Sequence, residues 1–299
     1  LALVAPFLFS LPSQASAQSA ALPAVVSVDG LSTELARPGL VVLQLGSDSS
    51  FRAAHVPSAQ RLDFDGVVLA PAVQGGLRME LPAPERLENG LRALGVRSDS
   101  RIVIVFDTPQ AFTRASRTFF TLEWAGLRGR VAVLDGGLPA WRAANKQMSS
   151  GTALRVAAGD VRVQQDAARL ATRDSVRAAT EGRGRRLVDA RTPEFYENTR
   201  DNGMPRGGHI ASAVNLPFNV AMGADGRLKP KVELEQLVAA AGIGADEALT
   251  TYCHIGLQAS WMYLTLRHLG RDVTMYDGSF DEWSRDESLP LGSRPAQRP

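Results

Sequence analysis

The feature of this sequence that most constrains its fold is an internal repeat. A Leu-Asp-Gly-Gly segment at 134–137, with Trp141 six residues after Asp135, recurs as Tyr-Asp-Gly-Ser at 276–279, with Trp283 six residues after Asp277. Two further pairs of segments recur in the same order, so the chain is predicted to hold two copies of one domain. These pairs are 54–59 (AHVPSA) with 208–213 (GHIASA), and 102–107 (IVIVFD) with 249–253 (LTTYC).

Each copy alternates short strand-like runs with helical patterns, which indicates an α/β fold. In such folds a mainly parallel sheet is flanked by helices. A stretch rich in Ser, Gly and Ala at 145–160 is typical of a linker. We therefore expect one domain at 24–145 and a second at 165–299. In the second copy the expected strands are 186–190, 248–252 and 273–276, and the expected helices are 232–241 and 259–269.

Size and charge limit the classes of function. The 299 residues are 44% hydrophobic, which suits one large or two ordinary globular domains. The 33 basic residues nearly balance the 31 acidic ones, and no block of Lys or Arg stands out. This pattern argues against a nucleic-acid surface.

The first residues have the pattern of a secretory leader. An apolar run at 1–11 is followed by Ala-Ser-Ala at 15–17, as in a signal peptide with its cleavage site. The run is too short for a transmembrane helix, which needs about 20 apolar residues. We expect a signal peptide at 1–17, incomplete at its start, and a mature chain from near Gln18. The mature protein would be exported, in a bacterium to the periplasm, and would not associate with the membrane. The alternative is a buried strand or helix.

Cys253 is the single cysteine of the chain, so no internal disulfide can form. It is either a buried small hydrophobic residue or a reactive thiol. It stands between an apolar run and a helical pattern, at the kind of strand-to-helix turn where open α/β sheets bind ligands. Free N–H groups at a helix start stabilise a thiolate or a persulfide anion, so we expect an acidic thiol. The predicted active-site loop consists of His254, Ile255, Gly256, Leu257 and Gln258.

Several motifs together resemble the rhodanese family of sulfurtransferases. The Cys-x-x-Gly-x-x-Ala stretch at 253–259 resembles that family's active-site loop, and Asp-Gly-x-x-x-x-Trp at 277–283 resembles its C-terminal signature. The resemblance covers nearly all of the chain after the leader and implies two tandem rhodanese-like domains. In tandem members only the second domain carries the cysteine, and here Asp107 stands in the first copy where Cys253 stands in the second. The opening motifs of the family are matched by 187–191 (LVDAR), 208–210 (GHI) and 215–217 (NLP).

The resemblance implies a sulfurtransferase of the thiosulfate or 3-mercaptopyruvate type. An anionic donor would pass sulfane sulfur to Cys253, and a nucleophilic acceptor such as cyanide, a thiol or another protein would take the outer sulfur from the resulting persulfide. No metal or organic cofactor would be needed for this reaction. The first domain would be non-catalytic and would either wall the cleft or only stabilise the fold. Thiosulfate-type loops have basic residues after the cysteine and mercaptopyruvate-type loops have Gly and Ser. This loop has His254 and Ile255, so both donors stay open.

Candidate donor-binding residues come from the same resemblance, because an Arg fork matches carboxylate and sulfonate oxygens. Arg78 stands before a Met-Glu-Leu-Pro run, where mercaptopyruvate-type members have a His. Arg200, or less well Arg206, matches a family Arg that precedes Gly-His-Ile, while Phe195 stands where many members have another Arg. Two acidic residues complete the predicted site: Asp189, expected to bond backbone near the thiol, and Asp63, expected to face the cleft from the first domain.

His254 leaves two interpretations. His254 could assist proton transfer or add positive charge beside the thiolate, or it could simply face solvent. His55 and His209 occupy turn positions and are expected to be structural. Asp277 and Trp283 are likewise expected to support the fold.

Other classes of protein fit less well. A cysteine phosphatase requires an Arg six residues after the cysteine, and that position holds Ala259. A Cys–His hydrolase would need a base near the thiol, for which His209 is a candidate. The main alternative is a rhodanese-fold module that carries sulfur or binds a partner without turnover.

Overall fold

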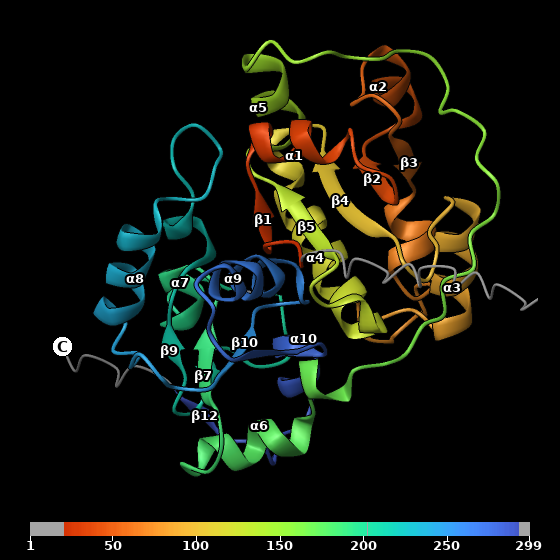
Figure 1. Cartoon of the computed structure of the whole chain (residues 1–299). Helices are drawn as coiled ribbons and strands as arrows, with labels where there is room; N and C mark the ends of the chain where they lie inside the picture. The colour runs from red at the N-terminus through yellow and green to blue at the C-terminus, as the bar shows by residue number, and fades with distance from the viewer. Residues whose placement is uncertain (1–20, 202, 293–299) are drawn as a thin grey trace, which may run out of the picture.

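The structure is a computed structural model that describes residues 21–201 and 203–292. It contains two five-stranded sheets in which all neighbouring strands run parallel (Figure 1). This confirms the predicted class of two α/β domains with mainly parallel sheets. The first sheet has the order β1-β5-β4-β2-β3, with strands Val25–Val26, Val131–Leu134, Arg101–Phe106, Leu40–Leu45 and Gln60–Leu62. The second has the order β6-β11-β10-β7-β9, with strands Leu170–Ala171, Val273–Tyr276, Leu249–Tyr252, Arg186–Asp189 and Val214–Asn215.

The two sheets correspond strand for strand, as a duplicated domain requires. In each, the strand that leads to the Asp-Gly motif lies second in the order, and the strand that leads to Asp107 or Cys253 lies third. A small antiparallel pair joins β8 (His209–Ile210) to β12 (Leu291–Gly292) in the second domain, and an isolated antiparallel bridge between His55 and Ser149 is its counterpart in the first.

Helices cover both faces of each sheet. Along β4, Ile102 and Ile104 point into one buried cluster while Val103 and Val105 point into another, which explains why this strand is apolar throughout. The helices are α1 (Val28–Glu34), α2 (Asp48–Ala53), α3 (Pro84–Ala93), α4 (Phe112–Leu122), α5 (Gly137–Ala143), α6 (Arg173–Thr180), α7 (Pro193–Tyr196), α8 (Lys231–Ala240), α9 (Leu257–His268) and α10 (Ser279–Trp283).

The domains meet through α4 and α9, which lie side by side at the centre of the molecule (Figure 1). The ring of Phe120 on α4 meets Tyr263 on α9 edge to face, with centroids 5.1 Å apart. The Tyr263 hydroxyl donates to Glu123 at 2.7 Å, and Arg267 binds the same carboxylate through Nε and Nη2 at 3.0 Å. One buried apolar cluster runs through both domains, so the two domains share a core.

The Asp-Gly motifs tie each domain to the other. Asp135 Oδ1 accepts a hydrogen bond from the Leu228 N–H of the second domain at 2.9 Å. Asp277 Oδ2 accepts one from the Leu81 N–H of the first domain, also at 2.9 Å. The repeated aspartates therefore support the fold, as expected, by satisfying backbone groups across the domain boundary.

The two repeat histidines also play equivalent structural roles. His55 Nδ1 lies 2.8 Å from the Phe51 carbonyl, and its ring stacks on Phe51 at 4.1 Å. His209 Nδ1 lies 2.8 Å from the Tyr196 carbonyl, and its ring stacks on Tyr196 at 3.7 Å. Each histidine fixes the chain that leaves a short helix, which agrees with the structural reading.

Predicted elements lie within two residues of the observed ones. The helix expected at 259–269 begins at Leu257, because Gly256 already turns the chain with a φ of 89°. Between α5 and Ala167 the chain has no helix or strand longer than one isolated bridge, and it runs along the outside of the first domain (Figure 1). The predicted leader at 1–17 lies outside the described residues.

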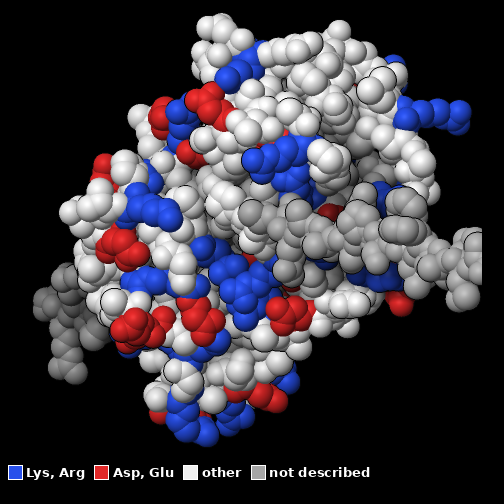
Figure 2. All heavy atoms as spheres, in the orientation of Figure 1, with Lys and Arg blue, Asp and Glu red and all other residues white. Residues whose placement is uncertain are grey.

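Surface charge follows the composition. Basic and acidic side chains lie next to each other over the second domain, in the lower part of Figure 2. Across residues 21–201 and 203–292, no helix is long and apolar enough to cross a bilayer.

Candidate active site

The Cys253 thiol lies at the turn between β10 and α9. Its side chain is buried, with 1% of its surface exposed, and Sγ accepts a hydrogen bond from the Gly256 N–H at 3.2 Å. Gly256 caps α9 in a left-handed conformation that residues with a Cβ rarely adopt. A Cβ at this position would lie 2.7 Å from Arg117 Nη1. Gly256 is therefore required both by the turn and by its neighbour.

Burial controls the protonation of this thiol. It raises the pKa of Cys253, and the N–H groups of Ala259, Ile255, Gly256 and Gln258 only partly offset that effect. The expectation of an acidic resting thiol is therefore wrong. Sequence reasoning identified the N–H groups but could not weigh them against the loss of water around the sulfur.

The pH dependence of alkylation tests this correction. The neutral thiol is stable up to the raised pKa, so we expect the rate with iodoacetamide to reach half its maximum above about pH 8.5, the ordinary value for a thiol. Because Cys253 is the single cysteine, the signal has no background, and N-acetylcysteine serves as the parallel control. A midpoint below that of the control would show that the helix start dominates after all.

His254 is a neutral neighbour of the thiol. Burial, and next the nearby charge of Arg191, lower the pKa of His254 below its ordinary value. The imidazole therefore adds no positive charge near neutral pH, which corrects one of its two expected roles. Its Nδ1 lies 3.3 Å from Gln258 Oε1, an acceptor, so Nδ1 carries the proton and Nε2 can accept one. The Phe195 ring packs edge to face on it at 4.7 Å.

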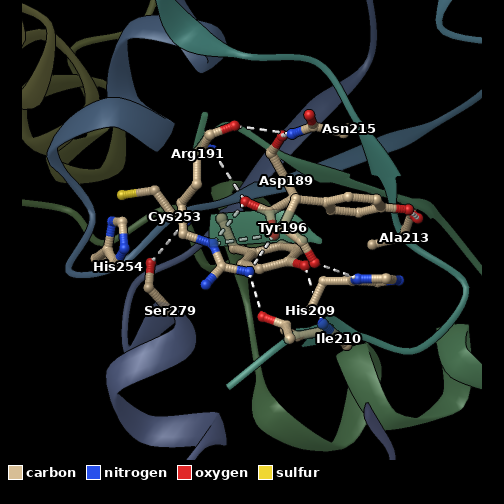
Figure 3. Close-up of polar contacts among 12 residues, drawn as sticks. Asp189, Arg191, Tyr196, His209, Ile210, Ala213, Asn215, Cys253, His254 and Ser279 are labelled. Atoms are coloured by element: carbon tan, nitrogen blue, oxygen red, sulfur yellow. Dashed lines mark hydrogen bonds and ion pairs between the residues drawn. The ribbon is translucent and has the colours of Figure 1, made fainter. Parts of the chain in front are cut away.

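A buried ion pair lies behind the thiol (Figure 3). Asp189 accepts from the Arg191 N–H at 2.9 Å and from Nε at 2.9 and 3.0 Å, and it also binds Nη2. Asp189 thus binds backbone beside the site, as predicted. The Arg191 guanidinium lies 4.2 Å from the centre of the Phe280 ring, while Sγ of Cys253 points away from it (Figure 3).

Arg191 is a residue whose role sequence reasoning missed. It was read as part of a motif, yet it is fully buried, and its Nη1 has no hydrogen-bond partner among the described residues. Its charge is close enough to Cys253 for each to affect the other. The sequence signal that could have indicated this buried role is a charged residue directly after an apolar strand pattern.

The start of α10 holds the thiol turn from the other side. The Cys253 N–H donates to Ser279 Oγ at 3.4 Å, and the Phe280 N–H donates to the Cys253 carbonyl at 2.9 Å. The Asp281 N–H donates to the His254 carbonyl at 3.0 Å. The second Asp-Gly motif therefore positions the active-site loop directly.

A cavity of about 530 Å³ opens above the thiol, and both domains line it. Six lining residues come from the second domain: Phe218, Cys253, His254, Ile255, Leu257 and Gln258. The first domain contributes Gln110, Phe112 and Thr113 from the turn before α4 and its first residues. The first domain thus forms part of the wall of this cavity.

Arg117 of α4 connects the first domain to the loop. It is fully buried, its Nη1 pairs with Asp277 Oδ1 at 2.5 Å, and its Nη2 donates to the Met79 carbonyl at 2.5 Å. The contact of Nη1 with the face of Gly256 places this guanidinium directly against the active-site loop.

Two of the predicted arginines lie near the loop but outside the cavity wall. Arg78 reaches across the domain boundary, where its Nε binds Asp281 at 3.1 Å, and its charge lowers the pKa of His254. Arg200 lies over the Phe195 ring at 5.1 Å and pairs with Glu194 at 3.8 Å. Both are more than half exposed and could turn toward an anion.

The two other candidates lie elsewhere. All three nitrogens of the Arg206 guanidinium donate to carbonyls of Trp283, Ser284, Asp286 and Leu289, so this side chain holds the C-terminal segment. Asp63 lines a separate cavity of about 670 Å³ in the first domain, together with Asp107. Neither residue faces Cys253, which corrects both expectations. Both residues were chosen by their position relative to a motif, and that position does not show which groups the folded chain brings into contact with them.

The duplicated parallel-sheet domain with one thiol at its strand-to-helix turn defines a class of enzyme that works by covalent thiol chemistry. The Rhodanese-like domain profile matches residues 172–286. A Pseudomonas aeruginosa protein described as a probable 3-mercaptopyruvate sulfurtransferase is 33% identical over 282 residues, covering 90% of this chain and 98% of the relative. A thiosulfate sulfurtransferase of Corynebacterium glutamicum is 28% identical over 279 residues, covering 89% of each chain.

Among solved structures, SseA of Escherichia coli, described as a 3-mercaptopyruvate sulfotransferase, has the same fold. It matches with a TM-score of 0.74 and 23% identity over 86% of this chain and 99% of that chain. The chain therefore belongs to the rhodanese family of sulfurtransferases. It is an enzyme with sulfurtransferase activity, and the reading as a non-catalytic module is not favoured.

Proposed function

We propose that Cys253 accepts sulfane sulfur from thiosulfate or 3-mercaptopyruvate and passes it to a nucleophile such as cyanide or a thiol. The observation that carries this proposal is the position of the only thiol, at the base of a cavity and against the Gly256 N–H. A sulfur-bound anion at this turn meets backbone donors that are already in place.

The two half-reactions balance without a cofactor. The Cys253 thiolate attacks the outer sulfur of thiosulfate, the sulfur–sulfur bond breaks, and sulfite leaves with the electron pair. With 3-mercaptopyruvate the carbon–sulfur bond breaks, and the carbanion equivalent takes a proton to become pyruvate. Cyanide then attacks the outer sulfur of the Cys253 persulfide, which releases thiocyanate and restores the thiolate.

Arg78 is more than half exposed and could turn toward an anionic donor, whereas the charge of Arg191 is paired with Asp189. Arg191 lies behind the thiol, and Arg78 lies within electrostatic reach of His254. His254 carries its proton on Nδ1, so Nε2 can accept a hydrogen bond at the loop.

Steady-state kinetics with the two donors side by side test the proposal. With cyanide as acceptor, we expect thiocyanate from at least one donor and parallel lines in double-reciprocal plots, the signature of a ping-pong reaction. Absence of thiocyanate with both donors, in protein that melts cooperatively, would return the chain to the class of sulfur carriers.

Export is a second part of the proposal and rests on the pattern at 1–17. Protein expressed with its complete leader should be recovered from the periplasm with an N-terminus near Gln18. Cytosolic protein that retains the leader would contradict export while leaving the enzymatic proposal intact.

A further inference from the structure

The wall of the cavity above Cys253 is mostly apolar. Phe112, Phe218, Ile255 and Leu257 line it, and each is partly exposed. The remaining lining groups are amides, a hydroxyl, the thiol and an imidazole whose pKa is lowered, so no charged side chain of the described residues lines this space. The wall therefore offers an apolar contact surface, and the donors available to an anion are the backbone N–H groups at the thiol turn.

The aromatic side of the cavity is rigid. Phe112 packs edge to face on Trp261 at 4.8 Å and lies nearly parallel to Phe218, with ring centres 6.1 Å apart. These contacts join the first domain to the second at the cavity wall. A cavity of about 530 Å³ falls within the ~300–1,000 Å³ range of small-molecule sites and is far larger than cyanide.

The nearby arginines do not change this character. Arg78 is bound to Asp281 and Arg200 lies over Phe195, and neither lines the cavity. The Phe195 ring packs edge to face on His254 at 4.7 Å, so the loop is flanked by an aromatic ring at that point. Charge can attract a donor to the loop from outside, while the cavity itself fits an apolar body.

From this wall we infer that the sulfur acceptor is a small organic thiol with an aromatic or branched apolar body. The inference rests on the proposed persulfide at Cys253. The acceptor sulfur attacks the outer sulfur of the persulfide anion, the bond between the two sulfurs breaks, and Cys253 leaves as its thiolate. The thiol proton stays with the product, an organic persulfide, so atoms and charges balance.

The test uses the full chain loaded with thiosulfate or 3-mercaptopyruvate and freed of donor by gel filtration. Single-turnover transfer is then followed with phenylmethanethiol and with 2-mercaptoethanol, each corrected for its uncatalysed reaction with a small persulfide. Burial of one aromatic ring should give phenylmethanethiol an advantage of about 10- to 100-fold in second-order rate constant. Equal constants for the two thiols, within threefold, would overturn the inference.

A variant pair locates the effect. Phe218→Ala should lower the constant for phenylmethanethiol about tenfold and leave that for 2-mercaptoethanol within twofold. The matched control is Val232→Ala, because Val232 is an apolar residue that is 65% exposed on α8, outside the cavity, and neither constant should change. Equal losses for both thiols in Phe218→Ala would contradict recognition of the apolar body.

The loading step tests the proposed function, and the transfer step tests the identity of the acceptor. Protein that gains no sulfur from either donor contradicts the proposed function and the inference with it. Protein that loads and then reacts without preference contradicts the inference alone.

Discussion

Cys253→Ser is expected to fold and to lose sulfur transfer by at least about 1,000-fold, because a hydroxyl cannot form the persulfide on which turnover depends. The substitution changes one atom in a buried site, and the new hydroxyl can accept the Gly256 N–H that the sulfur accepts now. The thermal midpoint should therefore stay close to that of the wild type. Thiocyanate production and a melting curve measure the two effects separately.

The matched control for this substitution is Asp107, the residue of the first domain that corresponds to Cys253 in the repeat. Asp107 directly follows β4 as Cys253 directly follows β10, and its Oδ2 accepts a hydrogen bond from the Ser50 hydroxyl at 2.7 Å. Asp107→Ser should retain turnover within about twofold, since a carboxylate at this turn carries no sulfur. Substantial turnover in Cys253→Ser would refute the nucleophile assignment, whereas loss in both variants would point to damage of the shared core.

Arg117→Met is expected to lower the free energy of unfolding by about 3–5 kcal/mol, the usual cost of removing one partner from a buried ion pair. Asp277 would still accept the hydrogen bond from the Leu81 N–H, but its buried carboxylate would lose the guanidinium that pairs with it. Chemical denaturation monitored by tryptophan fluorescence measures the change.

The same substitution should impair catalysis in the protein that remains folded. Arg117 lies against Gly256, so its removal frees the turn that aims the Gly256 N–H at the sulfur. We expect a fall of about tenfold or more in kcat, in line with the loss of one positioned donor to a reacting anion. Arg52→Met is the matched control, because the Arg52–Asp48 pair is exposed and should contribute less than about 1 kcal/mol. Equal stability of Arg117→Met and Arg52→Met would contradict the role of Arg117.

Local pattern predicted the architecture well, since the signals lie within each element. The apolar runs before Asp107 and Cys253 become the central strands of two like sheets, and in each sheet the Asp-Gly motif follows the strand next to the central one. The position of Cys253 at a strand-to-helix turn follows from the same runs. These features depend on periodicity along a few residues, which a single sequence displays.

Long-range contacts were not predictable in this way. Arg117 meets an aspartate 160 positions away, and Arg206 meets carbonyls about 80 positions away. The protonation of Cys253 depends on how much water the fold removes, and the apolar cavity depends on two phenylalanines from different domains. Each is a property of packing, which propensity and spacing do not encode.

Cys253 is expected to carry the transferred sulfur as a persulfide. Intact mass spectrometry after incubation with thiosulfate or 3-mercaptopyruvate should show a gain of about 32 Da, one sulfur on a covalent carrier. Peptide mapping should place that gain on the peptide containing Cys253, and cyanide should remove it with release of one equivalent of thiocyanate. Continued thiocyanate turnover without any added mass on Cys253 would contradict the account.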